Sequence, residues 1–390
     1  MSPEVYPFSN VSITGGTGTV GSQFIKVLLA QFPHVAKIHT MCRNPQAASA
    51  RRIPASPRVD VIHGPLEDPA VLTAIVERGE IVYHLAAWLA NTDMPAMTSI
   101  YITNSLVPAV LARLCAAKGK RLVFTSSHSV YFAGPYEGRI AEDSFRFRPD
   151  FLAWIAAVRG EYCALADMLI AGTTSFSAAA SSIDAIHRKL PPPFEPKIYD
   201  RDAYHIYSLT KLLAERLVLD HGGIVLRLSN VYGPGDESNQ AVGEACQRIL
   251  AADPNVETPI LQPFKKLLPT YLGDILKALL RAGTLRLPEG LSPVFTVASQ
   301  ENYLREDALL RAVAEGLNTI RGTQCNYRIE TLPAEAAASF TYDLGKMRKY
   351  LLYGEELMPF KEGVRAQLAW RMQRAGDLGT QGADLAIEFA

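Results

Sequence analysis

The sequence is poor in cysteine and has no two cysteines in close spacing. The five are scattered, and none belongs to a Cys-x-x-Cys motif: Cys42, Cys115, Cys163, Cys246 and Cys325. An odd and scattered set argues against a disulfide framework and against a zinc site, because both need clustered or paired thiols. We therefore expect buried free thiols, no bound metal and a reducing cytoplasm as the setting.

An excess of charge of either sign is also missing. The 39 Lys and Arg residues balance 39 Asp and Glu residues, so no net positive field attracts nucleic acid or an anionic membrane. No uninterrupted apolar stretch approaches the roughly 20 residues that span a bilayer, and the first ten residues do not resemble a secretory signal. The expected partner is a small molecule, with neither nucleic acid nor a membrane involved.

What the sequence does have is a regular alternation of two patterns over its first 130 residues. Short apolar runs predict strands at 10–14, 37–42, 58–64, 80–87 and 120–127. Segments of helical period predict helices at 18–32, 68–79 and about 95–118. Such alternation is typical of parallel βαβ units, so we expect an α/β fold, a Rossmann-type doubly wound parallel sheet.

A glycine-rich loop, TGGTGTVG at 14–21, lies between the first strand and the first helix. Gly15 permits a tight turn, Gly18 lets a pyrophosphate approach the backbone, and Gly21 allows close packing of helix on strand. The following helix offers free N–H groups to the phosphates. We therefore predict that this loop binds a dinucleotide. The predicted site also includes the residues beside the three glycines: Thr14, Thr17, Thr19 and Val20.

The type of dinucleotide is suggested by the absence of carboxylates from Val5 to Val59. NAD sites usually carry an Asp or Glu near the end of the second strand, where it binds the ribose 2′-hydroxyl. Here Arg43 stands after that strand, and a guanidinium can pair with a 2′-phosphate. NADP(H) is therefore favoured over NAD(H), and the alternative is that Arg43 is an ordinary surface arginine.

The alternation breaks after residue 137 and resumes with a helix at 204–222 and a strand at 223–230. Residues 1–137 and 204–235 are assigned to the dinucleotide-binding domain, 236–370 to a smaller substrate-binding region and 371–390 to a weakly periodic tail. Residues 138–203 are predicted as an insertion with helices at 150–172 and 176–190. Its apolar face, which includes Trp154, either packs on the body or serves as a lid or subunit interface.

Three residues from distant parts of the chain form a candidate proton-transfer site. Tyr207 and Lys211 lie four apart on a predicted helix, so both side chains can point the same way. A free phenol has a pKa of about 10, and a nearby ammonium favours the phenolate. Ser127 ends the fifth strand, at the edge of the sheet where ligands bind. A second Tyr-x-x-x-Lys, Tyr342 to Lys346, lacks such a strand before it.

These motifs, taken in order, resemble the extended short-chain dehydrogenase/reductases, also called the NAD-dependent epimerase/dehydratase family. The matching segments are TGGTGTVG (14–21), HLAA (84–87), FTSSHSVY (124–131), YSLTKLLAE (207–215), LRLSNVYGPGD (226–236) and PTYLGDILKALL (269–280). The resemblance implies that Ser127, Tyr207 and Lys211 are catalytic, with Lys211 also contacting the cofactor.

The same resemblance implies further site residues. Ala86 and Ala87 match the loop that passes the cofactor, Asn230 matches a substrate-contacting asparagine, and Asn104 matches a mostly structural one. Ser126 and His128 flank Ser127 and are predicted near the substrate, although His128 could instead be a solvent-facing loop residue. Leu66, after the third strand, is included among the cofactor-binding residues. Pro65 stands where relatives carry an adenine-contacting Asp, which leaves Glu67 or Asp68 as a substitute.

Two departures from the family leave the reaction open. Ser127 and Tyr207 are separated by the insertion, and an arginine that binds sugar nucleotides is missing near Lys265 and Lys266. The implied activity is hydride transfer at a carbinol or carbonyl carbon, either in a sugar-nucleotide epimerase or in an NADPH-dependent ketoreductase acting on another small molecule. A catalytically silent dinucleotide sensor is a third hypothesis, whereas a dehydratase is disfavoured because His128 and Ser129 follow Ser127. Relatives commonly dimerise, so a homodimer is expected.

Overall fold

The computed structural model describes residues 6–89, 97–134, 138–193, 200–238, 242–261, 267–331 and 340–376. The chain divides into two compact units. Unit 1 consists of Met1–Tyr136, Glu142–Arg227 and Leu279–Phe295, and unit 2 of Glu137–Ala141, Leu228–Ala278 and Thr296–Ala390. The division differs from the predicted boundaries, because residues 279–295 join the dinucleotide-binding part while residues 137–141 join the C-terminal part.

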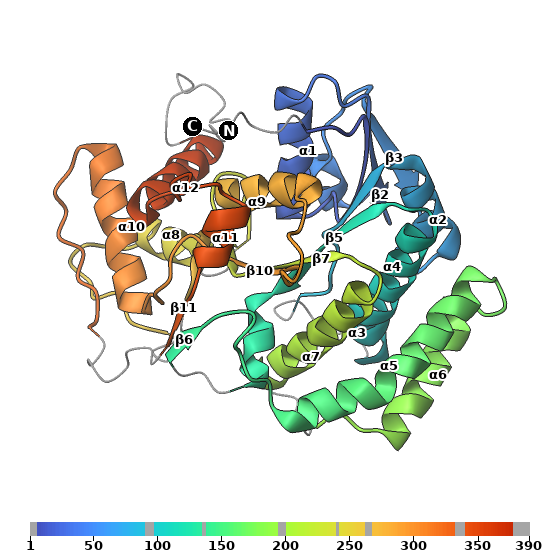
Figure 1. The fold of residues 1–390 in the computed structure, drawn as a ribbon. Coiled ribbons are helices and arrows are strands. Elements are labelled where there is room, and N and C mark those ends of the chain that lie inside the picture. The colour runs from blue at the N-terminus through green and yellow to red at the C-terminus, as the bar shows by residue number, and fades with distance from the viewer. Residues whose placement is uncertain are drawn as a thin grey trace. The chain divides into compact units, whose positions relative to one another are not determined.

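A seven-stranded sheet organises unit 1 (Figure 1). Its order is β10-β7-β5-β4-β1-β2-β3, and the pairs from β3 to β5 are all parallel. The order reverses between β1 and β4, which is the switch point at which doubly wound sheets bind ligands. The strands are β1 (Asn10–Thr14), β2 (Lys37–Cys42), β3 (Val59–His63), β4 (Ile81–His84), β5 (Arg121–Ser127), β7 (Ile224–Leu228) and β10 (Val294–Val297). The predicted Rossmann-type fold is confirmed.

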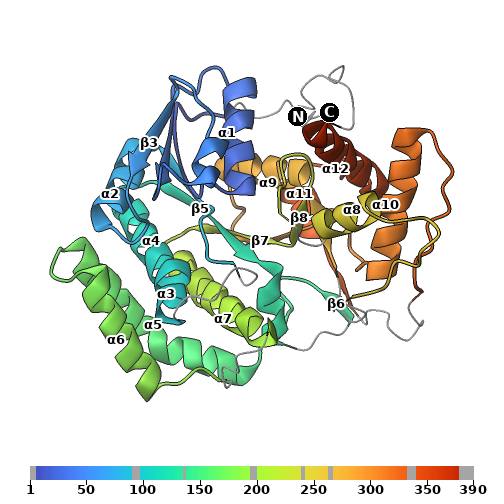
Figure 2. The same cartoon turned by 180° about the vertical axis from the view of Figure 1, so that it is seen from behind.

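Helices cover both faces of this sheet (Figures 1 and 2). The helices α2 (Pro69–Arg78), α4 (Val107–Ala117) and α7 (Asp200–Leu219) share one apolar core, whereas the buried residues of α1 (Thr19–Gln31) lie outside that core. α2 begins where Asp68 accepts a hydrogen bond from the Ala70 N–H and Pro69 occupies the first turn. A proline without a free N–H is well suited to that position.

The predicted helix at about 95–118 is interrupted in its middle. α3 (Met97–Tyr101) is followed by a π-helical segment, Ile102–Leu106, and then by α4. Short π-helical segments inside α-helices are often found at functional sites. Met97–Ala117 is long and apolar enough to cross a membrane by length and composition, but most of it is buried inside the protein, as in a core helix.

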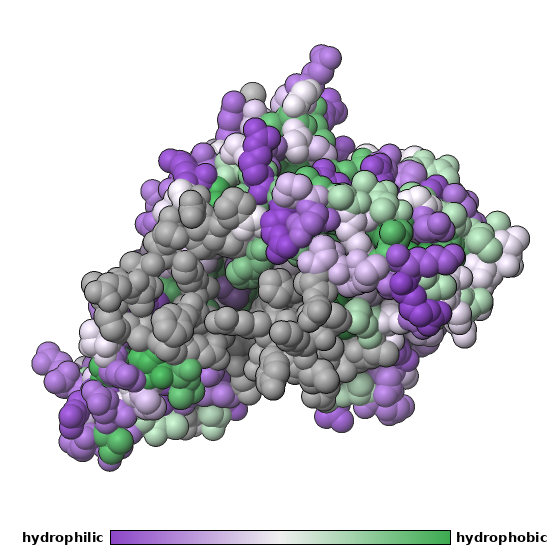
Figure 3. Space-filling view, turned by 90° about the horizontal axis from the view of Figure 1, so that it is seen from below, coloured by the Kyte–Doolittle hydropathy of each residue, from purple (hydrophilic) through white to green (hydrophobic). Residues whose placement is uncertain are grey.

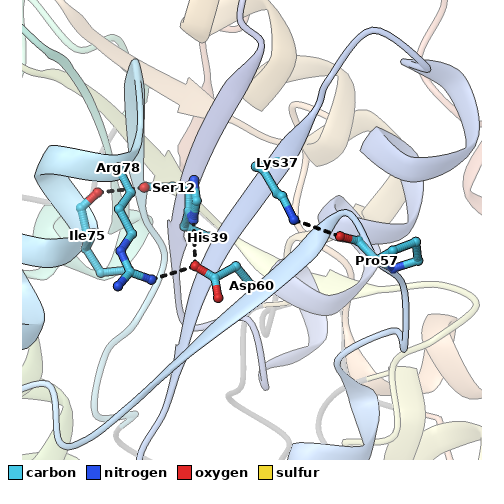
Figure 4. A network of polar contacts seen from close by, with 7 residues as sticks. All are labelled: Ser12, Lys37, His39, Pro57, Asp60, Ile75 and Arg78. Atoms are coloured by element: carbon cyan, nitrogen blue, oxygen red, sulfur yellow. Dashed lines mark hydrogen bonds and ion pairs between the residues drawn. The ribbon is translucent and has the colours of Figure 1, made fainter.

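Polar contacts join the outer strands to α2 (Figure 4). One oxygen of Asp60 on β3 accepts hydrogen bonds from His39 on β2 at 3.0 Å and from Arg78 at 2.5 Å. Ser12 on β1 donates to the Ile75 carbonyl at 2.6 Å. These contacts hold β1, β2 and β3 against α2.

The insertion forms two helices, α5 (Pro149–Ile170) and α6 (Phe176–Lys189), close to the predicted ranges. Its apolar face is buried in the core that α4 and α7 share, with Trp154 and Tyr162 both covered. The Trp154 indole N–H donates to the Leu190 carbonyl at 2.9 Å, and His187 of α6 stacks on Tyr101 with ring centroids 4.0 Å apart. This face therefore packs on the body of unit 1, as one of the two alternatives expected.

Unit 2 has short strands and helices around a second apolar core. The sheets are pairs: β6 (Gly138–Ile140) with β11 (Phe340–Tyr342), and β8 (Asn230–Tyr232) with β9 (Pro269–Tyr271). The helices are α8 (Val242–Leu250), α9 (Leu272–Thr284) up to Ala278, α10 (Glu306–Arg321), α11 (Gly345–Tyr350) and α12 (Phe360–Ala375). Residues 371–375 of the predicted weakly periodic tail continue α12, and residues 377–390 lie outside the described part.

Exposed large hydrophobic side chains are spread over several elements rather than gathered on one. Leu152 and Met168 lie on α5, whereas Val256 and Leu261 lie in a loop of unit 2. On the face drawn in Figure 3, hydrophilic and hydrophobic residues are interspersed. Scattered exposed apolar residues are normal for folded proteins and need no partner to explain them.

Replacing Trp154 by Ala should destabilise the protein by about 3–5 kcal/mol, the usual cost of removing a large buried aromatic side chain. The substitution removes the indole ring from the apolar core that the insertion shares with α4 and α7, together with the hydrogen bond to the Leu190 carbonyl. Equilibrium unfolding in urea measures the difference.

Leu152→Ala, on the exposed side of the same helix, is the matched control and should change stability by no more than about 0.5 kcal/mol. Equal effects of the two substitutions would contradict the packing of α5 on the body of unit 1.

Candidate active site

The glycine-rich loop has the close backbone contacts that the sequence predicts. Gly15 has a φ of 77°, and a Cβ added there would lie 2.7 Å from the Ala86 nitrogen. A Cβ on Gly21 would lie 2.2 Å from the Gly15 carbonyl oxygen. Gly18 precedes α1 with an extended backbone and has no side chain to cap the helix. The first N–H groups of α1 are thus available to a phosphate, which fits the pyrophosphate of a dinucleotide.

The switch point is held by a small polar network. The buried Thr14 hydroxyl lies 2.7 Å from Nδ1 of His84 on the paired strand β4, and it accepts from the Ala86 N–H at 3.3 Å. The network fixes the residues after β4 against the glycine loop. Thr17, Thr19, Val20 and Ala87 are half-buried around the loop, a position that leaves part of each side chain accessible to a ligand.

Lys211 joins the helix α7 to the strand β5. Its ammonium is fully buried, donates to the Thr125 carbonyl at 2.8 Å and lies 4.6 Å above the Phe124 ring. Ser127 ends β5, two residues beyond Thr125, and Tyr207 is half-buried one turn before Lys211. The structure therefore brings the predicted Ser127, Tyr207 and Lys211 to neighbouring elements at the carboxyl edge of the sheet.

Burial dominates the electrostatics of this group. It lowers the pKa of Lys211 to about 7, and the carboxylate of Glu215, one turn further along α7, acts in the opposite direction. Burial, and then the charge of Lys211, lower the pKa of His84 to about 3. At neutral pH His84 is therefore uncharged, whereas the pKa of Lys211 lies close to neutrality.

Ser126 and His128 flank the candidate Ser127 but differ from each other. The Ser126 hydroxyl donates to Glu215 at 2.5 Å and is buried, so its contact in this structure is internal. His128 begins a 3₁₀ turn, His128–Ala133, and burial lowers its pKa to about 4. The alternative of a solvent-facing His128 is wrong. Substrate contact by either residue stays a prediction.

Asn104 lies in the π-helical segment and clamps the backbone of Trp88. Its Oδ1 accepts from the Trp88 N–H at 2.9 Å, and its Nδ2 donates to the Trp88 carbonyl at 3.2 Å and to the Thr210 hydroxyl at 3.4 Å. Thr210 in turn donates to the Tyr207 carbonyl at 2.9 Å. Asn104 thus connects the segment after Ala86 and Ala87 to the backbone of α7 beside Tyr207, in agreement with its structural assignment.

Asn230 belongs to unit 2 and has a local partner there. Its side-chain oxygen accepts from the Leu268 N–H at 3.1 Å, next to the pairing of β8 with β9. The predicted substrate contact of Asn230 stays a prediction. Lys265 and Lys266 lie outside the described residues.

The residues after β2 and β3 form an ion pair that the sequence did not predict. Arg43, which is exposed, donates to Glu67 at 2.7 Å, and Thr103 donates to the other oxygen of Glu67 at 2.7 Å. Arg43 therefore already has an anionic partner in this structure. Leu66 is buried in the apolar core, and Asp68 caps α2, so Glu67 is the carboxylate that pairs with Arg43.

The second Tyr-x-x-x-Lys does not form an equivalent pair. Tyr342 ends β11 and is buried, whereas Lys346 lies on α11. The two side chains do not share a face of one helix, so the pattern has no chemical meaning there. Sequence spacing alone could not distinguish this motif from that of Tyr207 and Lys211. The distinguishing feature was the strand ending in Ser127, which precedes Tyr207 and has no counterpart before Tyr342.

Sequence reasoning missed Glu215 and Arg227, which form a buried ion pair beside Ser126. The Arg227 guanidinium binds both oxygens of Glu215, at 3.0 and 2.7 Å. Two signals were present: a Glu four residues after Lys211 on an apolar helix face, and an Arg inside an apolar strand. Charges at such positions are rarely buried unless they are paired.

Comparison with known proteins adds a family to this geometry. Residues 11–149 match the model of the NAD dependent epimerase/dehydratase family, which confirms the resemblance for that part of the chain. A UDP-glucose 4-epimerase of Yersinia enterocolitica is 29% identical over 128 residues, covering 31% of this chain and 38% of the relative. The match thus spans well under half the length of that curated relative.

Two solved structures share the fold over nearly their whole length. The Bordetella bronchiseptica enzyme WbmG, in complex with NAD and UDP, has a TM-score of 0.62 and 18% identity, with 95% of this chain and 96% of the other covered. UDP-glucuronic acid 4-epimerase from Bacillus cereus, in complex with NAD, has a TM-score of 0.62 and 17% identity, with 96% and 100% covered. At this identity the likeness shows the fold.

Gly21→Ala should weaken dinucleotide binding, because the added methyl group would lie 2.2 Å from a backbone oxygen of the same loop. We expect a loss of affinity for a nicotinamide dinucleotide of at least about tenfold, the equivalent of about 1.4 kcal/mol. The measurement is fluorescence titration of the protein with the reduced dinucleotide.

Gly160→Ala is the matched control, since a Cβ there meets no atom within 4 Å in the middle of α5. It should leave affinity unchanged and stabilise the helix by roughly 0.5–1 kcal/mol. Normal binding by the Gly21 variant would show that this loop does not hold the phosphates.

Proposed function

We propose that the chain, whose residues 11–149 match the NAD dependent epimerase/dehydratase family, is an NAD(P)-dependent oxidoreductase of the extended short-chain dehydrogenase/reductase type. The observation that carries the proposal is the buried hydrogen bond from Lys211 to the Thr125 carbonyl at 2.8 Å. It joins the helix of Tyr207 to the strand of Ser127, two strands from the strand that precedes the glycine loop. A bound nicotinamide dinucleotide supplies a hydride donor or acceptor at this edge.

Each residue has a definite part in the proposed chemistry. In the reducing direction, Tyr207 donates a proton to the oxygen of the substrate while the carbon that bears it receives hydride. Ser127 orients that oxygen by a hydrogen bond. In the oxidising direction Tyr207 takes up the proton of the hydroxyl group as hydride leaves the carbon. The positive charge of Lys211 stabilises the phenolate that forms or persists between these steps.

A sugar nucleotide is the substrate class that we propose first. The similar proteins named above act on or bind UDP-linked compounds, and NVYGPGD and YSLTKLLAE are closest to the epimerase branch. An epimerase oxidises and then reduces the same carbon, so its dinucleotide stays bound and is regenerated. An NADPH-dependent ketoreductase is the second candidate, favoured by Arg43 and by the missing arginine near residues 265 and 266.

The retained dinucleotide separates these candidates. Absorbance of the purified protein, before and after dialysis, shows whether a nicotinamide dinucleotide is bound and whether it exchanges. Tightly held, non-exchanging dinucleotide with turnover of a UDP-sugar supports the epimerase. Exchangeable NADPH that is consumed with a carbonyl compound supports the ketoreductase.

Tyr207→Phe should lower kcat by about 10²- to 10⁴-fold, the usual contribution of a general acid–base group, while dinucleotide binding is retained. The measurement is turnover of whichever substrate the wild-type protein accepts, with dinucleotide binding followed in parallel.

Tyr342→Phe, in the unrelated Tyr-x-x-x-Lys, is the control and should keep wild-type kcat. A Tyr207 variant with full kcat would contradict the proposed mechanism. A wild-type protein that binds the dinucleotide but turns over none of the substrates tried, with binding unaffected by Tyr207→Phe, would favour the silent sensor.

We further propose NAD(H) as the physiological cofactor. Arg43 favours NADP(H) only if its guanidinium is available to a 2′-phosphate, and here it is paired with Glu67 at 2.7 Å. A 2′-phosphate approaching Arg43 would also meet the negative charge of Glu67. NAD is the dinucleotide present in both solved structures compared above, so the preference for NADP(H) has no support among them.

Glu67→Gln should therefore improve affinity for NADPH on the order of tenfold, because it releases Arg43 and removes a like charge next to the phosphate. The affinity for NADH should change much less, because NADH has no 2′-phosphate. Both dissociation constants are measured by fluorescence titration.

Asp60→Asn removes a β3 carboxylate that binds Arg78 of α2 and serves as the matched control. It should leave the ratio of the two constants unchanged. If Glu67→Gln leaves this ratio unchanged as well, the pair does not determine the choice of cofactor.

A cytoplasmic location and a homodimer complete the proposal. The cytoplasm is supported by the five cysteines, all of which are free. Within one chain, α5 packs on both α4 and α7. A dimer formed through the outer side of α4 and α7 would therefore have to displace α5. We therefore expect a dimer to use another surface, which sedimentation analysis of wild-type protein and surface variants can locate.

A further inference from the structure

A buried ion pair lies directly beside the candidate active site. Glu215 on α7 and Arg227 on β7 are joined by two hydrogen bonds, and their side chains are 1% and 4% exposed. The Arg227 guanidinium lies over the rings of Tyr131 and Phe147, at 4.8 and 5.5 Å. Neither charge has access to water, so each depends on the other.

Stability alone gives a weak reason for such a pair. Removing two charges from water costs several kcal/mol per ion, and buried pairs can often be replaced by apolar residues without loss. Most of the buried residues around α4, α5 and α7 are apolar. A costly pair at this position therefore suggests a role in the chemistry of its neighbours.

The pair contacts both halves of the candidate site. Glu215 follows Lys211 by four residues on α7, so the two side chains lie on the same helix face. One oxygen of Glu215 also accepts a hydrogen bond from Ser126, the residue before Ser127. The carboxylate is thus linked to the end of β5 and lies one helical turn from the ammonium.

The surroundings of Lys211 offer no other compensating anion among the described residues. His84 on β4 is neutral at physiological pH, and its own pKa is lowered by the charge of Lys211. The burial of Lys211 lowers its pKa, and Glu215 is the group that raises it. The charged or titratable groups on the elements around Lys211 include Tyr207, Glu215 and Arg216 on α7, Tyr83 and His84 on β4, Arg121 on β5, Arg227 on β7, and His128 and Tyr131 after β5.

We propose that Glu215 is a positioning residue that favours the charged form of Lys211 and fixes the end of β5 that carries Ser127, while Arg227 holds the Glu215 carboxylate in place. The inference rests on the proposed function, because it concerns the protonation of Lys211. It goes beyond that function by making a residue outside the catalytic group responsible for the pH range in which the group works.

Two variants test the proposal. Glu215→Gln keeps the acceptor for Ser126 but leaves Arg227 buried without a charged partner, which is expected to be strongly destabilising. The double variant Glu215→Gln with Arg227→Met removes both charges and keeps the acceptor, so it should fold. The pKa of Lys211 is read from an NMR titration of protein labelled with ¹³C at the lysine side chains, with the signal assigned by Lys211→Met.

In the double variant, the pKa of Lys211 should fall by about one pH unit, since a nearby anion no longer favours the ammonium. If the protein turns over a substrate, the pH at which kcat/KM falls on the alkaline side should also be lower by about one unit. Activity at pH 8 should then be about tenfold lower than in the wild type and should recover toward pH 6. A merely structural role would not produce this recovery.

The matched control is Glu306→Gln with Arg248→Met, which removes a partly buried Glu–Arg pair of unit 2. It should leave the Lys211 titration unchanged. An unchanged Lys211 pKa in the Glu215 and Arg227 double variant would overturn the proposal. The titration needs no substrate, so absence of turnover in the wild type would count against the proposed function and leave this test intact.

Discussion

The site depends on one hydrogen bond, from the buried ammonium of Lys211 to the carbonyl of Thr125. Burying an ammonium in an apolar core is unfavourable unless its protons have acceptors and its charge has a compensating neighbour. The Thr125 carbonyl, the face of the Phe124 ring and the Glu215 carboxylate supply these. Because the ammonium is satisfied only there, α7 can occupy only one position along β5, and Tyr207 and Ser127 are placed relative to each other as a consequence.

The parallel sheet explains why the other parts of the site meet at the same edge. β1, β4 and β5 all run in the same direction, so the glycine loop, Ala86 and Ser127 follow strand ends that lie side by side. The Thr14 hydroxyl then joins the first two of these segments through His84 and the Ala86 N–H. A ligand at this edge is surrounded by backbone that is fixed from several strands at once.

The sequence predicted the features that depend on local patterns. Each apolar run before residue 130 became a strand, and the glycine spacing, the Asp68–Pro69 helix start and the two insertion helices had local signals that did not depend on the rest of the fold. Features that depend on contacts between distant residues could not be predicted this way. The pairing of Arg43 with Glu67, the contacts of Asn104 with Trp88 and Thr210, and the Glu215–Arg227 pair each join residues that only the folded chain brings together.

The length of the insertion between Ser127 and Tyr207 had raised the question of whether the two could meet. The answer follows from where its helices pack. α5 and α6 bury their apolar faces in the same core as α4 and α7, and Arg159 of α5 pairs with Asp220 just beyond the end of α7. The chain therefore leaves the sheet after β5 and adds a layer of helices on the outside of α4 and α7. It then returns to α7, where Lys211 still donates its hydrogen bond to Thr125. Extra loop length costs little chain entropy, and the added layer offsets that cost by its own buried surface. A long separation in sequence is thus compatible with a site whose geometry is set by Lys211 and Thr125 rather than by the connection between them.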